Sequence, residues 1–323
     1  MKNFAAAETA IRAATKIPGA VLGLLLPDGT RKVTATGHAQ REPTQVPMQR
    51  ETWFDLASLT KVIFTTPAIL DQVARGNITL DDPLAKAIPD LRQYDVANAP
   101  ERRLTFRQCL THQTFLPAVE PLYTYGQDPQ TLRAFILQRE WRHGPPVYSD
   151  INFVLLGIAL ERLTGHAMID LAPETFTFRP DPERCAATEH CTWRRRIMRG
   201  KVHDENAYAL GGASGHAGLF GTADALLDFA RALLDEFPNE FKRRETKSRT
   251  IGWEISYSNW SGGDTCSPQT IGHTGFTGTG LWIDPERRRA WTLLTNRVHP
   301  TRHADTGIAA LRQKIGTLLA VEN

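Results

Sequence analysis

Segments with the composition of β-strands lie at both ends of this 323-residue chain, and helical patterns fill its middle. Near the start, residues 20–39 contain two β-type runs around the turn Pro27-Asp28-Gly29, which predicts a hairpin. Near the end, residues 250–258 and 278–298 are rich in aromatic and β-branched residues, and Asp284-Pro285-Glu286 splits the second segment into another hairpin. We therefore expect one α/β layer built from both termini, with a mainly helical insertion between them.

The spacing of apolar residues and the stop signals predict helices at 4–15, 58–75, 150–165, 222–237 and 303–322. Pro67 should kink or split the second of these, because proline lacks an N–H and clashes with the preceding turn.

The length suits two packed subdomains. We predict an α/β subdomain formed by 1–57 and 240–323, and a mainly helical subdomain formed by 58–239.

Composition argues against several classes of function. The net charge of +3 is too small to predict nucleic-acid binding, and the basic clusters at 193–201, 241–249 and 286–289 are interrupted by acidic, apolar or turn residues. No apolar run approaches the roughly 18 residues of a membrane span. The first residues lack the apolar core of a signal peptide, so we expect a cytoplasmic protein without a membrane partner.

Neither the cysteines nor the clustered polar residues predict a metal site. Four cysteines in a chain of this length do not form a disulfide framework, and Cys185 and Cys191 around His190 do not have a familiar zinc spacing. The run His-Asp-Glu-Asn at 203–206 is contiguous, and adjacent side chains do not share one face of a helix or strand. We therefore expect no metal and no cofactor.

Ser58 and Lys61 stand three residues apart at the start of the predicted helix 58–75, so their side chains share one face of it. In one interpretation Ser58 is a nucleophile and Lys61 takes its proton, because a serine hydroxyl needs a base and burial lowers the pKa of a lysine. In the other, Ser58 only caps the helix and Lys61 points into water. The Ser-x-x-Lys pattern alone does not decide between them, because chance matches are common.

Two further segments favour the catalytic interpretation. Tyr148 follows two prolines and precedes a helix start, and a phenol near an ammonium group can act as a base. Farther along the chain, Thr274 offers a hydroxyl and Gly275 a bare backbone against which a substrate can lie. His273 adds a polar or positively charged group beside them.

Ser-x-x-Lys, a tyrosine motif and a His-Thr-Gly motif, in this order, resemble the penicillin-recognising serine hydrolases. The pattern is most similar to the branch that contains class C β-lactamases, D-alanyl-D-alanine carboxypeptidases and β-lactamase-like esterases. The resemblance covers about residues 15–305, with further agreement at 76–84, 104–118, 211–234 and 293–302. It implies an α/β (α+β) fold of the β-lactamase/transpeptidase type, with an antiparallel sheet flanked by the terminal helices and an active site in the cleft beside a helical subdomain.

The resemblance also implies roles for individual residues. Ser58 would attack a carbonyl and become acylated, while Lys61 and Tyr148 would pass the proton. The backbone N–H groups of Ser58 and Phe276 would form an oxyanion hole, whose donors are typically worth about 2.7–4 kcal/mol each.

Substrate binding would involve His273, Thr274, Gly275 and Asp150, and two of these depart from the family's pattern. His273 replaces the lysine that is usual in β-lactamases. Asp150 stands where Tyr-x-Asn is common, and it either holds Lys61 protonated or caps the helix that begins there. We favour the cap.

Three other polar positions have simpler interpretations. We expect His112 to be structural, His216 to shape a glycine-rich loop, and residues 203–206 not to line the cleft.

These motifs predict a metal-free serine hydrolase that acts through an acyl-enzyme on a small ester, an amide or a D-amino-acid peptide. Esterase and D-Ala carboxypeptidase activities fit equally well, with weak or no β-lactamase activity. The alternative is a non-catalytic sensor that keeps the penicillin fold, which Asp150 leaves open. The expected partner is a small molecule or short peptide, not nucleic acid or a membrane, and the sequence leaves the oligomeric state open.

Overall fold

The structure is a computed structural model that describes residues 2–126 and 128–321, and these residues form two compact units. The sheet unit consists of the chain up to Leu59, of Glu174–His203 and of the chain from Leu219 onward. The helical unit consists of Thr60–Pro173 and Asp204–Gly218.

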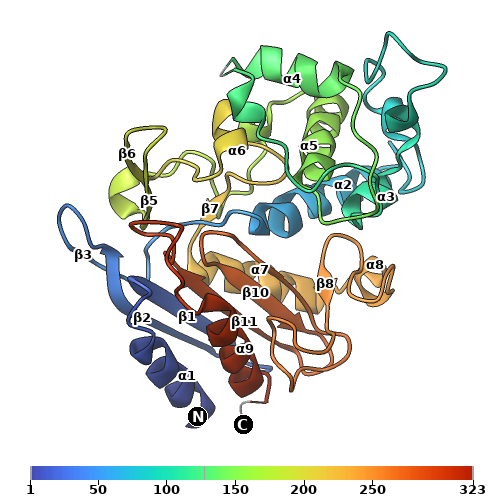
Figure 1. Ribbon diagram of the computed structural model, residues 1–323. Coiled ribbons are helices and arrows are strands. Elements are labelled where there is room, and N and C mark those ends of the chain that lie inside the picture. Colours follow the sequence, from blue (N-terminus) through green and yellow to red (C-terminus); the bar gives the residue numbers. More distant parts are fainter. Residues whose placement is uncertain (1, 127, 322–323) are drawn as a thin grey trace. The chain divides into compact units, whose positions relative to one another are not determined.

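A seven-stranded antiparallel sheet forms the sheet unit, in the order β3-β2-β1-β11-β10-β9-β8 (Figure 1). Its strands are β1 (Gly19–Leu25), β2 (Arg31–Gln40), β3 (Val46–Pro47), β8 (Glu254–Ile255), β9 (Ile271–Thr274), β10 (Gly280–Asp284) and β11 (Arg289–Thr295). β1 and β11 pair at the centre, with Leu22 opposite Leu293, although they come from opposite ends of the chain. The prediction that both termini build one layer is confirmed.

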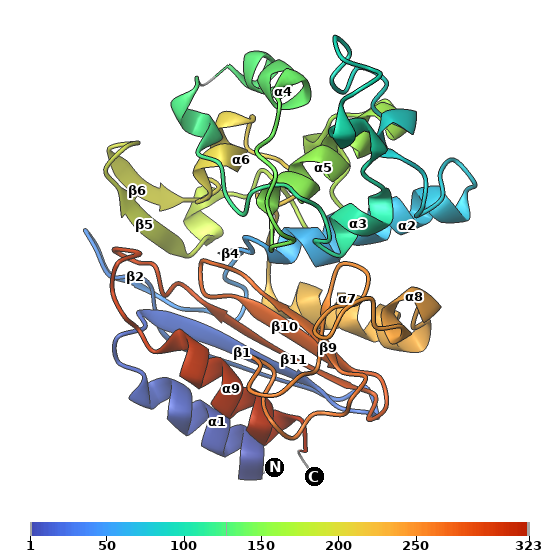
Figure 2. The same cartoon turned by 45° about the vertical axis from the view of Figure 1, so that its right-hand side comes forward.

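Helices cover both faces of this sheet. Figures 1 and 2 show α1 (Lys2–Ala13) and α9 (Ile308–Leu319) on one face and α7 (Ala223–Asp235) on the other. On β1, Leu22 and Leu24 belong to the core beneath α1 and α9, whereas a Cβ at Gly23 would lie 3.1 Å from Leu227 of α7. Because both faces are covered, β1 is buried along its whole length and shows no alternation of apolar and polar residues.

Two short ribbons complete the strands of the sheet unit: β4 (Phe54–Asp55) with β7 (Phe220–Gly221), and β5 (Ala187–Cys191) with β6 (Arg196–Arg199). The β5–β6 hairpin was not predicted, because its strands carry polar and charged residues, among them Glu189. The predicted strand 250–258 is reduced to β8, so most of that prediction is wrong. Only two of its residues pair with β9.

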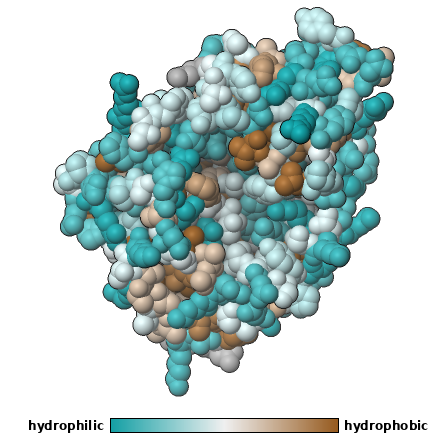
Figure 3. Space-filling view, in the orientation of Figure 1, coloured by the Kyte–Doolittle hydropathy of each residue, from teal (hydrophilic) through white to brown (hydrophobic). Residues whose placement is uncertain are grey.

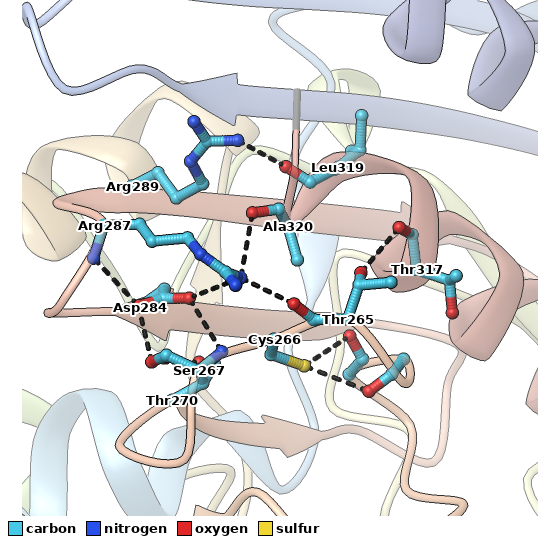
Figure 4. A network of polar contacts seen from close by, with 12 residues as sticks. Thr265, Cys266, Ser267, Thr270, Asp284, Arg287, Arg289, Thr317, Leu319 and Ala320 are labelled. Atoms are coloured by element: carbon cyan, nitrogen blue, oxygen red, sulfur yellow. Dashed lines mark hydrogen bonds and ion pairs between the residues drawn. The ribbon is translucent and has the colours of Figure 1, made fainter. Parts of the chain in front are cut away.

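A buried polar network fixes the end of α9 to the turn between β10 and β11 (Figure 4). Both carboxylate oxygens of the buried Asp284 accept hydrogen bonds from Ser267, from the backbone N–H at 3.1 Å and from the hydroxyl at 2.7 Å. The guanidinium of Arg287 donates to the carbonyl oxygens of Thr265 and Ala320, at 2.6 and 3.2 Å. The network therefore joins three segments that are distant in the sequence.

The helical unit is organised around α5 (Asp150–Thr164), which α2 and α3 contact. Its other helical segments are a π-helical stretch (Lys61–Thr65), α2 (Thr66–Ala74), α3 (Phe106–Leu110), α4 (Pro129–Gln138) and α6 (Glu205–Ala209). Every residue of α5 from Ile151 to Leu160 is buried, as expected for a helix that is apolar all round. The predictions of this helix and of its stop at Gly165, which has φ +73°, are confirmed.

The predicted helix 58–75 is not split at Pro67, because Thr65 and Thr66 both have right-handed helical backbone angles and the helical run continues through them. The helix type changes there instead: the π-helical stretch ends at Thr65, and Pro67 lies in the first turn of α2. The helix ends before Gly76, whose φ is +74°.

The unit boundaries differ from the predicted subdomains in two segments. Residues 174–203 and 219–239 belong to the sheet unit, although we predicted them within 58–239. For the second segment the reason is the apolar face of α7, which packs on β1 and β11. The short helix α8 (Asn239–Lys242) follows it.

Polar side chains dominate the visible surface. On the face shown in Figure 3, hydrophilic residues predominate and hydrophobic residues occur in small separate groups. Within residues 2–126 and 128–321, no helix has the length and apolar character needed to cross a membrane.

Candidate active site

Ser58 lies in a turn between β4 and the helical segment that begins at Leu59. The preceding residue, Ala57, has φ +47°, a conformation that costs free energy for a residue with a Cβ. The side chain of Asp55 supports this turn by accepting a hydrogen bond from the Ala57 N–H at 2.9 Å. The strained backbone therefore directly precedes the predicted nucleophile.

The segment after β9 packs against this turn. A Cβ at Gly275 would lie 2.5 Å from the carbonyl oxygen of Leu56, so only glycine fits there. The hydroxyl of Thr277 donates to the carbonyl oxygen of Asp55 at 2.7 Å, and that of Thr279 donates to Leu56 at 3.0 Å. The sheet unit thus holds the His-Thr-Gly segment and the approach to Ser58 side by side.

A buried arginine from α9 holds the same segment from the other side. Arg312 donates hydrogen bonds to the carbonyl oxygens of Gly275 and Thr279, at 2.8 and 2.7 Å. Burial and the nearby charge of Arg297 lower the pKa of Arg312 to about 10. At neutral pH the guanidinium is still charged and gives charge-assisted hydrogen bonds.

Lys61 is completely buried in the helical unit. Its Nζ lies 2.8 Å from Asp150 Oδ1, donates to the carbonyl oxygen of His216 at 3.1 Å, and lies 5.2 Å from the centre of the Tyr148 ring. The interpretation in which Lys61 points into water is therefore wrong. Burial alone would lower the pKa of Lys61, but the charge of Asp150 and the interaction with Tyr148 outweigh it, so the pKa is raised.

Asp150 is the counter-ion of Lys61, and our prediction that it caps α5 is wrong. The N-cap residue is Ser149, which has extended backbone angles, and its side chain makes no capping hydrogen bond. Asp150 is already the first helical residue. The physical reason is the cost of burying an ammonium group, which requires an opposite charge nearby.

Tyr148 packs against His112, whose contacts fit the structural role that we predicted for it. The two rings lie 4.4 Å apart between centroids, and His112 Nδ1 accepts a hydrogen bond from the backbone N–H of Ser149 at 3.0 Å. The hydroxyl of Ser149 donates to the carbonyl oxygen of Pro117 at 2.6 Å. No sequence pattern predicts this contact, because His112 is distant from Tyr148 along the chain.

The residue whose carbonyl group Lys61 contacts, His216, is held in place by Asp204. His216 Nε2 lies 2.9 Å from Asp204 Oδ1, and the pKa of Asp204 is lowered because the charges of His216 and Lys61 outweigh desolvation, which alone would raise it. The adjacent Gly215 packs directly on Gly157 of α5, where a Cβ on either residue would clash with backbone atoms. This close approach brings the loop at His216 to the side of α5.

The predicted site residues therefore fall into two groups. The helical unit brings together Lys61, Tyr148 and Asp150. The sheet unit holds the others, which are Ser58, His273, Thr274, Gly275 and Phe276. Within the described ranges, no group of three or more His, Cys, Asp or Glu side chains is arranged to hold a metal ion.

A family model described as Beta-lactamase matches residues 4–314 of the chain. A putative D-alanyl-D-alanine carboxypeptidase of Salmonella agona is 30% identical, over 77% of this chain and 70% of its own. The N-acetylmuramyl-L-alanine amidase of Bacillus subtilis is 28% identical, over 88% of this chain and 78% of its own.

Solved structures share the fold at low sequence identity. A class C β-lactamase has a TM-score of 0.74 at 18% identity, over 97% of each chain. The simvastatin synthase LovD from Aspergillus terreus has a TM-score of 0.73 at 20% identity, over 98% of each chain. EstCE1, described as a hydrolase with promiscuous acyltransferase activity, has a TM-score of 0.72 at 20% identity, over 99% of each chain. Together with the family match, these comparisons show that the chain belongs to the beta-lactamase family, whose members are serine hydrolases.

Proposed function

We propose that this protein hydrolyses a small ester, an amide or a D-amino-acid peptide through an acyl-enzyme on Ser58. The observation that carries the proposal is the burial of Lys61 beside Tyr148, paired with Asp150, in the helical segment that follows Ser58. A completely buried lysine is costly, and in this position a role in proton transfer accounts for the cost.

In this proposal Ser58 Oγ attacks the substrate carbonyl and Tyr148 accepts the Ser58 proton. Lys61 stays protonated because Asp150 raises its pKa, and its ammonium group stabilises Tyr148 as a phenolate, which becomes a neutral phenol when it takes the proton. The backbone N–H groups of Ser58 and Phe276 stabilise the oxyanion of the tetrahedral intermediate. The proton then passes to the leaving group, and a water molecule repeats the sequence to release the acyl group.

Both substrate classes have support among the relatives. The curated relatives include a carboxypeptidase and an amidase, whereas EstCE1 has the same fold and is described as a hydrolase with acyltransferase activity. We propose Thr274 and His273 as the residues that orient the polar part of the substrate. We propose that β-lactam hydrolysis is weak or absent.

A non-catalytic sensor is the second candidate, and the Lys61–Asp150 ion pair is the observation that favours it. A lysine held as an ammonium ion cannot itself remove the proton of Ser58. In a sensor, Tyr148 would not act as a base, and no acyl group would be transferred.

Intact-mass spectrometry separates the two candidates. The protein is exposed to short-chain nitrophenyl esters, penicillins and peptides that end in D-Ala-D-Ala. We expect a covalent adduct with the mass of one acyl group, accompanied by steady ester turnover, and neither in Ser58→Ala. No adduct and no turnover with any member of the panel would leave the sensor as the correct assignment.

Replacing Asp150 with asparagine tests the proposed protonation state. Without the carboxylate, burial dominates and the pKa of Lys61 falls. Since the protonated lysine is the active form here, we expect the alkaline limb of the pH profile of kcat/KM to move at least about one pH unit lower. A shift of the acidic limb instead would identify the neutral amine as the base and contradict our assignment.

Asp90→Asn is a matched control for this variant. Asp90 forms an ion pair with Arg162, whose side chain is largely exposed, and lies outside the Lys61 cluster. We expect its pH profile to be that of the wild type.

A further inference from the structure

Asp204 and His216 form a hydrogen-bonded pair in the helical unit that takes no part in the proton transfers proposed above. His216 Nε2 lies 2.9 Å from Asp204 Oδ1, and His216 Nδ1 lies 2.9 Å from the hydroxyl oxygen of Ser214. The side chain of His216 is only 1% exposed. Because the ring is buried and both of its nitrogen atoms have a partner, its orientation is fixed.

The backbone at His216 forms a tight turn that is attached to the helical segment of Lys61. The residues that flank Gly215 and His216 exchange two backbone hydrogen bonds, of 3.1 and 3.2 Å, which close the turn. The carbonyl oxygen of Gly215 accepts a hydrogen bond from the Thr65 hydroxyl at 2.7 Å, and that of His216 accepts one from Lys61 Nζ at 3.1 Å. Two successive carbonyl groups therefore hold side chains that are one helical turn apart.

The contact with the His216 carbonyl group helps to fix the direction of the Lys61 ammonium group. An ammonium group has three N–H donors. One is directed to Asp150 Oδ1 at 2.8 Å, one to the carbonyl oxygen of His216, and a third hydrogen bond joins Lys61 to Tyr148. Since these contacts together hold the buried ammonium group in one orientation, a displaced carbonyl group would disturb its contact with Tyr148.

Asp204 also acts on Lys61 through its charge. Desolvation alone would raise the pKa of Asp204, but the nearby charges of His216 and Lys61 and the hydrogen bonds that Asp204 accepts outweigh it, so the pKa is lowered. An anion that is stabilised by a cation stabilises that cation in return, so Asp204 is a second anion for Lys61, after Asp150. The titratable groups around the ammonium group are Tyr148, Asp150, Asp204 and His216, with His112 behind the Tyr148 ring.

We propose that His216, oriented by Asp204, is a positioning residue that holds the Lys61 ammonium group against Tyr148, and that the charge of Asp204 favours the ammonium form. His216 acts through its carbonyl group and through Lys61, and it forms no bond with the substrate. The inference rests on the proposed acyl-enzyme function. It gives Asp204 a role beyond capping α6, where it accepts a hydrogen bond from the backbone N–H of Ala207 at 2.8 Å.

Two substitutions of His216 test the role of its ring. Glutamine places an amide N–H near the position of Nε2 and keeps a donor for Asp204, whereas asparagine is too short to reach it. With a short-chain nitrophenyl ester we expect His216→Asn to lower kcat about 10–100-fold, as a small displacement of a reacting group does, with little change in KM. His216→Gln should recover most of that loss.

The fraction of each variant that forms the acyl adduct, measured by intact-mass spectrometry, corrects kcat for misfolded molecules. A purely structural role would lower this active fraction and leave kcat per active molecule unchanged, and that result would overturn the proposal. Equal values of the corrected kcat in His216→Asn and His216→Gln would also overturn it, whether both fall or neither does.

Asp204→Asn keeps the helix cap, because asparagine also caps helices, but it removes the charge. The pKa of Lys61 should then fall, so we expect the alkaline limb of the kcat/KM profile to move to lower pH, by less than in Asp150→Asn, since Asp204 acts through its charge. Asp128→Asn is the matched control, because Asp128 caps α4 in the same unit by accepting a hydrogen bond from the Thr131 N–H at 2.7 Å. Its profile should be that of wild type. An alkaline limb that stays in place in Asp204→Asn would contradict the proposal.

Direct titration of Lys61 separates a failure of this inference from a failure of the proposed function, because it needs no turnover. Nuclear magnetic resonance of lysine that is isotope-labelled at Cε gives a signal for Lys61, which is identified by its loss in Lys61→Met. The pKa read from this signal should be lower in Asp204→Asn than in wild type and in Asp128→Asn, even if no ester is hydrolysed. Equal values in all three proteins would refute the inference.

Discussion

Replacing Ser58 with alanine is expected to lower kcat for the best ester about 10⁴-fold or more, because the acyl-enzyme cannot form without the hydroxyl. The residual rate would come from substrate binding and the oxyanion donors alone. KM should change little, since the removed oxygen contributes to the reaction more than to ground-state binding. Steady-state kinetics with a nitrophenyl ester measures both quantities.

Ser258→Ala provides the comparison, because Ser258 is an exposed serine in a loop of the sheet unit. It should retain wild-type kinetics and the wild-type acyl adduct. A Ser58→Ala protein that still turned over within tenfold of wild type would show that another nucleophile performs the reaction.

Lys61→Met is expected to lower kcat about 10²–10⁴-fold, the usual contribution of a group that assists proton transfer. Methionine fills much of the same volume, so packing changes little. The substitution also leaves Asp150 without its cation, and removing one partner of a buried pair typically costs about 3–5 kcal/mol of stability. We expect a lower figure here, since the Asp150 side chain retains 21% exposure.

Combining Lys61→Met with Asp150→Asn separates catalysis from stability. The double variant removes the unpaired carboxylate, so the midpoint of denaturant unfolding should recover while activity stays lost. Recovery of activity together with stability would mean that Lys61 only maintains the fold. Lys86→Met is the control, because Lys86 is a partly exposed lysine paired with Asp82 on the surface.

The parts of the fold that could be predicted depend on local chemistry. The hairpin at Pro27-Asp28-Gly29 and the stop at Gly165 each follow from the backbone preferences of a few residues. The pairing of β1 with β11 followed from strand-type composition at both ends of the chain. Motif order was sufficient to identify the family.

The parts that could not be predicted depend on burial and on long-range contacts. The role of Asp150 depends on Lys61 being completely buried, and a sequence shows no burial. The contact between His112 and Tyr148 could not be predicted either, because the two residues are distant in the sequence and meet only in the folded helical unit. The β5–β6 hairpin was not predicted because a charged residue such as Glu189 is not expected in a buried strand. In the structure Glu189 is buried together with its partners, His203 and Arg302.

Through Arg312, helix α9 holds the loop that carries Phe276 in place. The residue belongs to α9, yet its hydrogen bonds end on Gly275 and Thr279. Partial detachment of α9, by heat or by truncation within the helix, would release Phe276, the proposed oxyanion donor, before the central sheet came apart. Loss of activity would then report fraying at the end of the chain rather than global unfolding.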